Sequence, residues 1–123
     1  MEYQTTINKP FTLSGPGLHT GKYTHATLKP APADTGIVLL RTDIEKMVSI
    51  PARAENVHDT NHGTTLAVGE VMVSTIEHMM SALHGMHVDN VFVEVDGPEI
   101  PILDGSARLW VNKITEVGLS TLD

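Results

Sequence analysis

The clearest structural signal lies in residues 71–95, which read VMVSTIEHMMSALHGMHVDNVFVEV. Val71–Val73 is predicted to form a hairpin with Thr64–Val68 around Gly69 and Glu70. Apolar residues then recur at the spacing of one helix face: Ile76, Met79, Met80, Leu83 and Met86. Val91–Val95 is almost entirely apolar and is predicted to be a central strand. This segment therefore indicates a chain that mixes strands and helices.

The elements on either side are predicted to be short strands and one further helix. Strands are expected at Tyr3–Leu13 (interrupted by Pro10), Tyr23–Leu28, Ile37–Arg41 and within Ser49–Val57. A turn is expected at Ser14–Gly17. A second helix is expected from about Ala107 to Val117, with Gly118 just beyond its end. The predicted fold is a single α+β domain over residues 1–123, a two-layer sandwich with two helices on one face of a mixed β-sheet.

Composition narrows the classes of function. The 123 residues are 41% hydrophobic and 19% charged, which is typical of a globular domain. The chain has no cysteine, so any metal site would use His, Asp or Glu. A net charge of −7 without a basic stripe argues against nucleic-acid binding. Because the sequence shows neither a signal peptide nor an apolar run of ~20 residues, we expect a cytoplasmic protein without a transmembrane segment.

Ser74–His78 admits two interpretations. The first is a capping box, in which Ser74 and Glu77 exchange hydrogen bonds at a helix start. The second is a metal site beyond the helix end, within reach of Glu77 and His78. The partial positive charge of a helix N-terminus keeps His78 neutral, as a metal ligand must be, and keeps Glu77 ionised, as a general base must be. The pattern alone leaves both open.

Two other segments contain side chains suited to chemistry. Gly15–Gly21 is rich in glycine and is either a tight hairpin or a loop that brings His19 to a ligand, and it lacks the phosphate-binding glycine patterns. Residues 96–106 contain three acidic side chains, and Asp104 or Ser106 is predicted to cap the second helix. The remaining closely spaced histidines are predicted to lie on the surface: His58, His62, His84 and His87.

Three segments together resemble the UDP-3-O-acyl-N-acetylglucosamine deacetylase family. They are Gly17–Gly21, Ser74–His78 running on to Asp89 and Asn90, and Pro98–Ala107. The weaker stretch at residues 28–33 agrees. Each motif is modest alone, but their joint order and spacing, over roughly residues 3–118, are specific.

The resemblance implies a zinc hydrolase from the cytoplasm of Gram-negative bacteria. The family removes the acetyl group from a UDP-linked, acylated N-acetylglucosamine, which commits that sugar to lipid A. By motif, His78 resembles a ligand of the Zn²⁺ cofactor and Glu77 resembles the general base that activates water. Leu18 and His19 would line the site near the substrate. Asp104 matches an aspartate close to the active site.

The resemblance also implies a second domain that brings the remaining zinc ligands, which nothing after Gly118 supplies. We therefore expect an amino-terminal domain that is inactive alone and whose partner is the enzyme's own second domain. Gly63 departs from the family, in which a cysteine is common. The alternative function is a non-catalytic, self-associating module, because an exposed partner face tends to find a second copy and form a homodimer.

Overall fold

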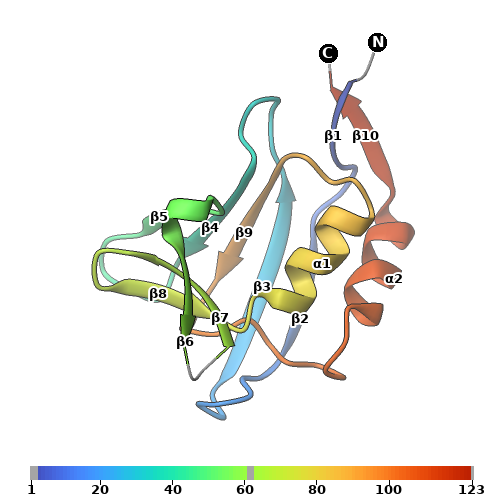
Figure 1. The fold of residues 1–123 in the computed structure, drawn as a ribbon. Helices are drawn as coiled ribbons and strands as arrows, with labels where there is room; N and C mark the ends of the chain where they lie inside the picture. The colour runs from blue at the N-terminus through green and yellow to red at the C-terminus, as the bar shows by residue number, and fades with distance from the viewer. Residues whose placement is uncertain (1–2, 61–62, 123) are drawn as a thin grey trace.

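The computed structural model describes residues 3–60 and 63–122, and Figure 1 shows how its elements are arranged. The strands are β1 (Gln4–Ile7), β2 (Phe11–Pro16), β3 (Tyr23–Pro30), β4 (Ile37–Arg41), β5 (Val48–Pro51), β6 (Val57–Thr60), β7 (Gly63–Val68), β8 (Val71–Ser74), β9 (Val91–Val95) and β10 (Leu119–Leu122). The helices are α1 (Glu77–Gly85) and α2 (Arg108–Val117), with a short 3₁₀ turn at Ala54–Asn56.

The largest sheet has five strands in the order β2-β3-β9-β4-β5. Its middle strand, β9, runs antiparallel to β3 and parallel to β4, which makes the sheet mixed. Val93 lies opposite Leu28 on one neighbour and Leu39 on the other, and all three side chains are fully buried. The prediction that Val91–Val95 is a central strand is therefore confirmed.

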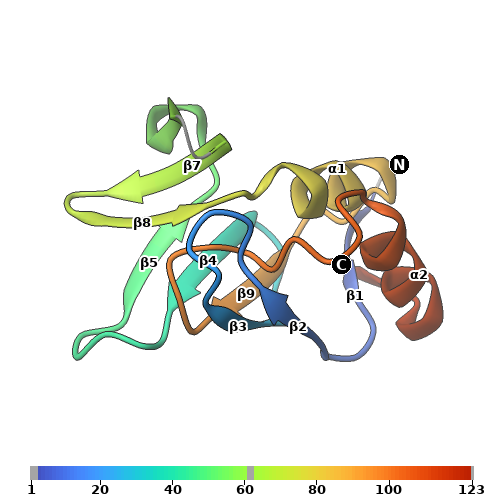
Figure 2. The same cartoon turned by 90° about the horizontal axis from the view of Figure 1, so that it is seen from below.

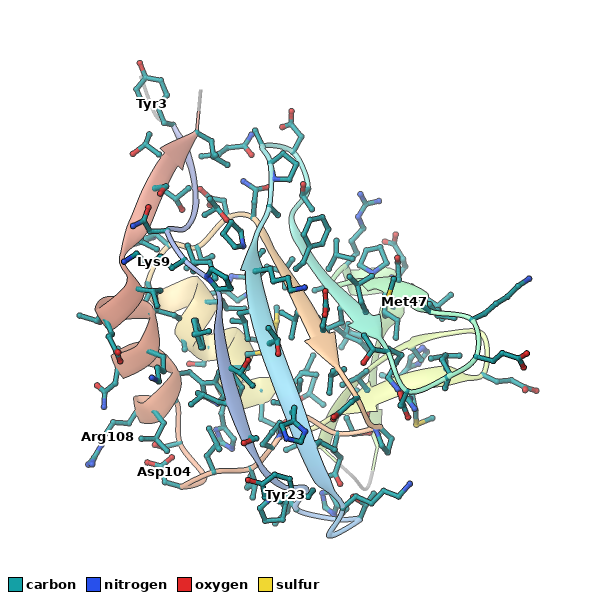
Figure 3. All side chains as sticks on the ribbon, turned by 180° about the vertical axis from the view of Figure 1, so that it is seen from behind. Tyr3, Lys9, Tyr23, Met47, Asp104 and Arg108 are labelled. Atoms are coloured by element: carbon teal, nitrogen blue, oxygen red, sulfur yellow. The ribbon has the colours of Figure 1, made fainter. Side chains whose placement is uncertain are left out.

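One face of this sheet is covered, and the other is open. The side chains of Thr24, Ala26 and Leu28 are buried, whereas those of Tyr23 and His25 are exposed, because successive strand residues point to opposite faces. Both helices and the three-stranded sheet β6-β7-β8 lie on the covered side (Figures 1 and 2). Figure 3 shows the open side, with α1 behind the sheet and α2 beside the edge strand β2.

The α+β class and the placement of two helices on one face are confirmed. The strands are divided among three sheets rather than one, since β1 pairs with β10 in a separate ribbon and β6-β7-β8 forms its own sheet. The hairpin predicted around Gly69 is β7–β8. Strands β6 and β10 were not predicted, although each pairs with a strand that the sequence does indicate, β7 and β1 respectively.

Both helices bury apolar side chains in the core. In α1, Met79 and Leu83 are fully buried, and in α2 the buried residues are Trp110 and Ile114. Gly118 ends α2 with a φ of 78°, the left-handed conformation that glycine adopts most easily. Neither helix of the described residues has the length and apolar character that crossing a membrane requires.

The turn predicted at Ser14–Gly17 is wrong. Strand β2 continues to Pro16, which pairs with Tyr23, and the turn follows at residues 17–22. The amide of Gly17 closes this turn by donating to the carbonyl of Lys22 at 2.8 Å. Proline is tolerated here because β2 is the edge strand of its sheet, where a missing N–H leaves no neighbouring acceptor unpaired.

The two faces of β4 provide a test of one-sided burial. Leu39 is fully buried, whereas Leu40 on the opposite face is only half-buried. Leu39→Ala should lower the free energy of unfolding by about 2–5 kcal/mol, because it leaves a cavity between β9 and β5. Leu40→Ala, the matched control, should cost clearly less. Urea denaturation measures both, and equal losses would contradict the described burial.

Candidate functional site

The start of α1 is built differently from a capping box. Ser74 belongs to β8, where its backbone N–H donates to the Pro98 carbonyl at 2.8 Å and its carbonyl accepts from the Ile100 amide at 3.0 Å. Its hydroxyl accepts from the Thr65 hydroxyl at 3.1 Å. The residue that precedes the helix is Ile76, which supplies no side-chain cap. The capping-box interpretation is therefore wrong, because pairing with the 98–100 segment keeps Ser74 in the sheet.

Glu77 is the first residue of α1, and its carboxylate does not cap the helix. Oxygen Oε1 is buried and has no hydrogen-bond partner among the residues that the structure describes. A carboxylate oxygen in this state lacks the donors that normally offset burial. Beside it lies Gly63, at which an added Cβ would come within 2.9 Å of Oε2. His78 follows on the helix and is half-buried.

A second carboxylate, that of Glu99, is buried and fully engaged. Its exposed fraction is 1%. Oε1 accepts from the His19 amide at 3.0 Å and from the Thr75 hydroxyl at 3.0 Å, and Oε2 accepts from the Thr20 amide at 2.9 Å. Burial raises the pKa of Glu99, but the hydrogen bonds from Thr20, His19 and Thr75 together outweigh it and hold the pKa below its usual value. Glu99 is therefore ionised at neutral pH.

The loop between β2 and β3 places Leu18 and His19 at the surface beside Glu99. Both side chains are exposed, and that of Leu18 is 58% accessible. The loop joins two antiparallel strands, so the hairpin interpretation of the glycine-rich stretch is confirmed. A pocket of about 220 Å³ opens next to the loop, and its lining residues are His19, Thr20, Met72, Ser74, Pro98 and Glu99.

Asp104 lies at the start of α2 and is exposed (Figure 3). Its Oδ1 accepts from the hydroxyl of Ser106 at 3.0 Å and from the amide of Ser106 at 3.1 Å. The Ser106 hydroxyl is the main cause of a pKa below the usual value for this carboxyl. Ser106 in turn accepts from the amide of Arg108, the first residue of α2, at 3.2 Å. Of the two predicted caps, Ser106 therefore contacts the helix, and Asp104 supports Ser106.

The structure brings together two of the motifs that carry predicted site residues. The His19 loop and the approach to Glu77 and His78 meet on Glu99, and these segments lie at one end of the molecule (Figure 1). Among the described residues, the hydrogen bonds of Asp104 stay within its own loop. Within the same residues, no three His, Asp or Glu side chains are grouped to hold a metal ion. Of the histidines predicted at the surface, three are exposed and His62 lies outside the described residues.

Sequence reasoning missed Glu99 and Thr75. The sequence contains a signal for the first, because Glu99 stands between Pro98 and Ile100-Pro101-Ile102. An acidic side chain within an apolar stretch must find donors if the stretch is buried. Thr75 has a φ of 60°, a conformation that β-branched residues rarely adopt and that no local pattern indicates.

Comparisons with known proteins agree with the motifs. A bifunctional enzyme LpxC/FabZ from Porphyromonas gingivalis is 52% identical over 119 residues, which are 97% of this chain and 26% of that protein. Proteins named UDP-3-O-acyl-N-acetylglucosamine deacetylase from Citrifermentans bemidjiense and a Geobacter species are 51% and 50% identical over 97% of this chain and 39% of their own length. The chain thus spans well under half of these relatives. The model of the UDP-3-O-acyl N-acetylglycosamine deacetylase family matches residues 4–123, and the chain belongs to that family.

Proposed function

We propose that this chain is the amino-terminal part of a zinc-dependent deacetylase acting on UDP-3-O-acyl-N-acetylglucosamine in lipid A synthesis, in the cytoplasm of a Gram-negative bacterium. Membership of the family and the names of the relatives support the reaction and substrate class. Because the chain spans only 26–39% of those relatives, we also propose that turnover requires a second domain.

The observation that carries the proposal is the buried Oε1 of Glu77, for which residues 3–60 and 63–122 provide no hydrogen-bond partner. A carboxylate oxygen that has lost water and gained no donor is stabilised by a nearby cation or by a proton that it receives. The neighbouring imidazole of His78 is a nitrogen ligand that zinc prefers. These two residues at the start of α1 therefore fit a zinc site, with His78 as one ligand and other ligands coming from outside the described residues.

The chemistry proposed for Glu77 is proton transfer in the hydrolysis of an acetamide. Zinc, when bound, would polarise the acetyl carbonyl and lower the pKa of the attacking water. Glu77 Oε1 accepts the proton of that water as the new C–O bond forms. The C–N bond then breaks as the proton held by Glu77 passes to the nitrogen, which leaves as the amine, and the second product is acetic acid, which ionises to acetate. We propose that His19 and Leu18, which are exposed on the β2–β3 loop, contact the sugar.

Self-association, the alternative function, stays a prediction. Asp104 also stays a predicted active-site residue, and in this structure it organises the loop before α2 through Ser106.

The first expected outcome concerns the chain by itself. If one zinc ligand is present where three are needed, residues 1–123 alone should show no turnover of the UDP-linked substrate above background. The full-length deacetylase assayed in parallel is the control. Release of acetate by the isolated chain that disappears in Glu77→Ala would contradict the proposed requirement for a second domain.

The second expected outcome separates the two residues at the start of α1. In the full-length deacetylase, Glu77→Ala should lower kcat by about 10²–10⁴-fold and leave the zinc content unchanged, because a general base is lost. His78→Ala should weaken zinc affinity by more than the about 10–100-fold that loss of an outer-shell partner costs. His84→Ala, an exposed histidine on the same helix, is the control. Equal zinc loss in the first two variants would show that Glu77 is a ligand.

The third expected outcome concerns the space that Gly63 leaves for Glu77. Gly63→Ala should shift the Glu77 carboxylate, because the new Cβ meets Oε2. Since a cysteine is common at this position in the family, kcat of the full-length deacetylase should fall by less than in Glu77→Ala. Gly69→Ala is a matched control, since Gly69 also has positive φ (61°, against 87° at Gly63) but nothing lies within 4 Å of its added Cβ. Both variants should lose stability of about 1 kcal/mol or somewhat more. A similar kcat for both would mean that Glu77 needs no such space.

A further inference from the structure

We propose that Glu99 is a positioning residue of the deacetylase site. Its buried carboxylate fixes Thr75, two residues before the general base Glu77, and at the same time fixes the backbone of His19 and Thr20. The proposal rests on the function proposed above, and it assigns to one side chain the task of holding the base and the substrate-facing loop in a fixed relation.

Both carboxylate oxygens of Glu99 already accept hydrogen bonds from the protein. Two backbone amides, those of His19 and Thr20, donate to its two oxygens, and the Thr75 hydroxyl donates to Oε1. The Thr20 side chain also contributes to lowering the pKa of this carboxyl. A carboxylate offers about four lone-pair sites. Glu99 is therefore occupied by the protein itself, which excludes a role as a free base and leaves one of fixing its donors.

The backbone of Thr75 has an unusual conformation. Its φ of 60° lies in the left-handed region, which is unfavourable for a β-branched residue. Such a conformation persists only where surrounding contacts impose it. The hydrogen bond from Thr75 Oγ1 to Glu99 is one such contact, and the Ile76 amide adds another by donating to the Thr64 carbonyl at 3.3 Å. This turn sets the direction in which α1, with Glu77 and His78, leaves β8.

Gly17 packs closely against the same carboxylate. A Cβ at Gly17 would collide with Glu99 Oε2 and would lie 2.9 Å from the Thr20 hydroxyl oxygen. The β2–β3 loop thus approaches Glu99 closely enough that position 17 admits only glycine. Because the amides of both His19 and Thr20 point at one carboxylate, the loop has little freedom to move relative to the turn at Thr75.

Burying the charge of Glu99 costs free energy. A buried carboxylate is expensive, and an apolar side chain of similar size often stabilises a core equally well or better. The donors around Glu99 come from two segments far apart in sequence, and each adjoins a predicted site residue. A role in setting the relative position of these two segments explains why a buried carboxylate is kept here, although packing of the core alone does not require one.

The structural arm of the test uses the isolated chain and no substrate. Glu99→Gln replaces one acceptor oxygen by an NH₂ group that cannot accept from an amide. Amide hydrogen exchange of His19 and Thr20, followed by NMR, should accelerate about 10–100-fold, as expected for loss of hydrogen bonds to a charged group. Glu94→Gln, which affects an exposed ion pair with Lys29 on the open face of the sheet, should leave both amides unchanged.

The kinetic arm uses the full-length deacetylase. Glu99→Gln should lower kcat by up to about a hundredfold and raise KM, with zinc content unchanged, because the base is misplaced rather than removed and the substrate-facing loop loses its hydrogen bonds. Thr75→Val should lower kcat in the same direction, and Thr75→Ser, which keeps the hydroxyl, should restore it. The double variant Glu99→Gln/Thr75→Val should be no worse than the more damaging single variant, since both remove one contact.

The two arms separate the possible failures. Unchanged exchange at His19 and Thr20 in Glu99→Gln would overturn the proposal whatever the enzyme does. If Glu99→Gln does not fold, Thr75→Val decides, and an unchanged kcat in that variant would overturn it as well. A wild-type protein that releases no acetate from the UDP-linked sugar would instead contradict the proposed function, and accelerated exchange would then still support Glu99 as the residue that fixes the loop.

Discussion

A carboxylate leaves water only where hydrogen-bond donors replace its hydration, and in this chain two segments far apart in sequence provide the donors for Glu99. The β2–β3 loop supplies two amides, the turn before α1 supplies a hydroxyl, and the 98–100 segment pairs with Ser74 through its backbone. The motifs that identify the family therefore converge because one buried charge needs them together. The cost of that burial is offset by several charge-assisted hydrogen bonds.

The five-stranded sheet supplies the rigid support for this arrangement. Its covered face is aliphatic, so α1 rests on fully buried side chains such as Met79 and Leu83, and its first residue is held at the end of the molecule where the β2–β3 loop lies. The covered layer combines two helices with the small β6-β7-β8 sheet, which brings Gly63 against Glu77. Chemistry at this end is separated from the open face, where His25 and Asp96 form an exposed pair at 2.8 Å.

Sequence patterns predicted the parts of the fold that depend on local burial. Ile37–Arg41 and Val91–Val95 coincide with β4 and β9, because a run of β-forming side chains between polar loops leaves little choice of conformation. The patterns failed where tertiary contacts override local preference. Ser74 has the sequence context of a cap, yet pairing with the 98–100 segment keeps it in β8. Glu99 was missed because its donors come from distant parts of the chain, which a single sequence does not bring together.

The parallel pairing of β4 with β9 has a consequence for the order of folding. All of residues 42–90, including the β6-β7-β8 sheet and α1, form the connection between these two adjacent strands. Closing so long a connection costs chain entropy before its contacts repay it, and pairings distant in sequence form slowly. During synthesis, a chain that ends just after α1 already contains the helix that bears Glu77 but lacks the strand on which the sheet closes. Neither the pairing of β4 with β9 nor the hydrogen bonds of Glu99 can form before residues 91–99 are made, so until then the apolar face of α1 has no complete sheet to pack on.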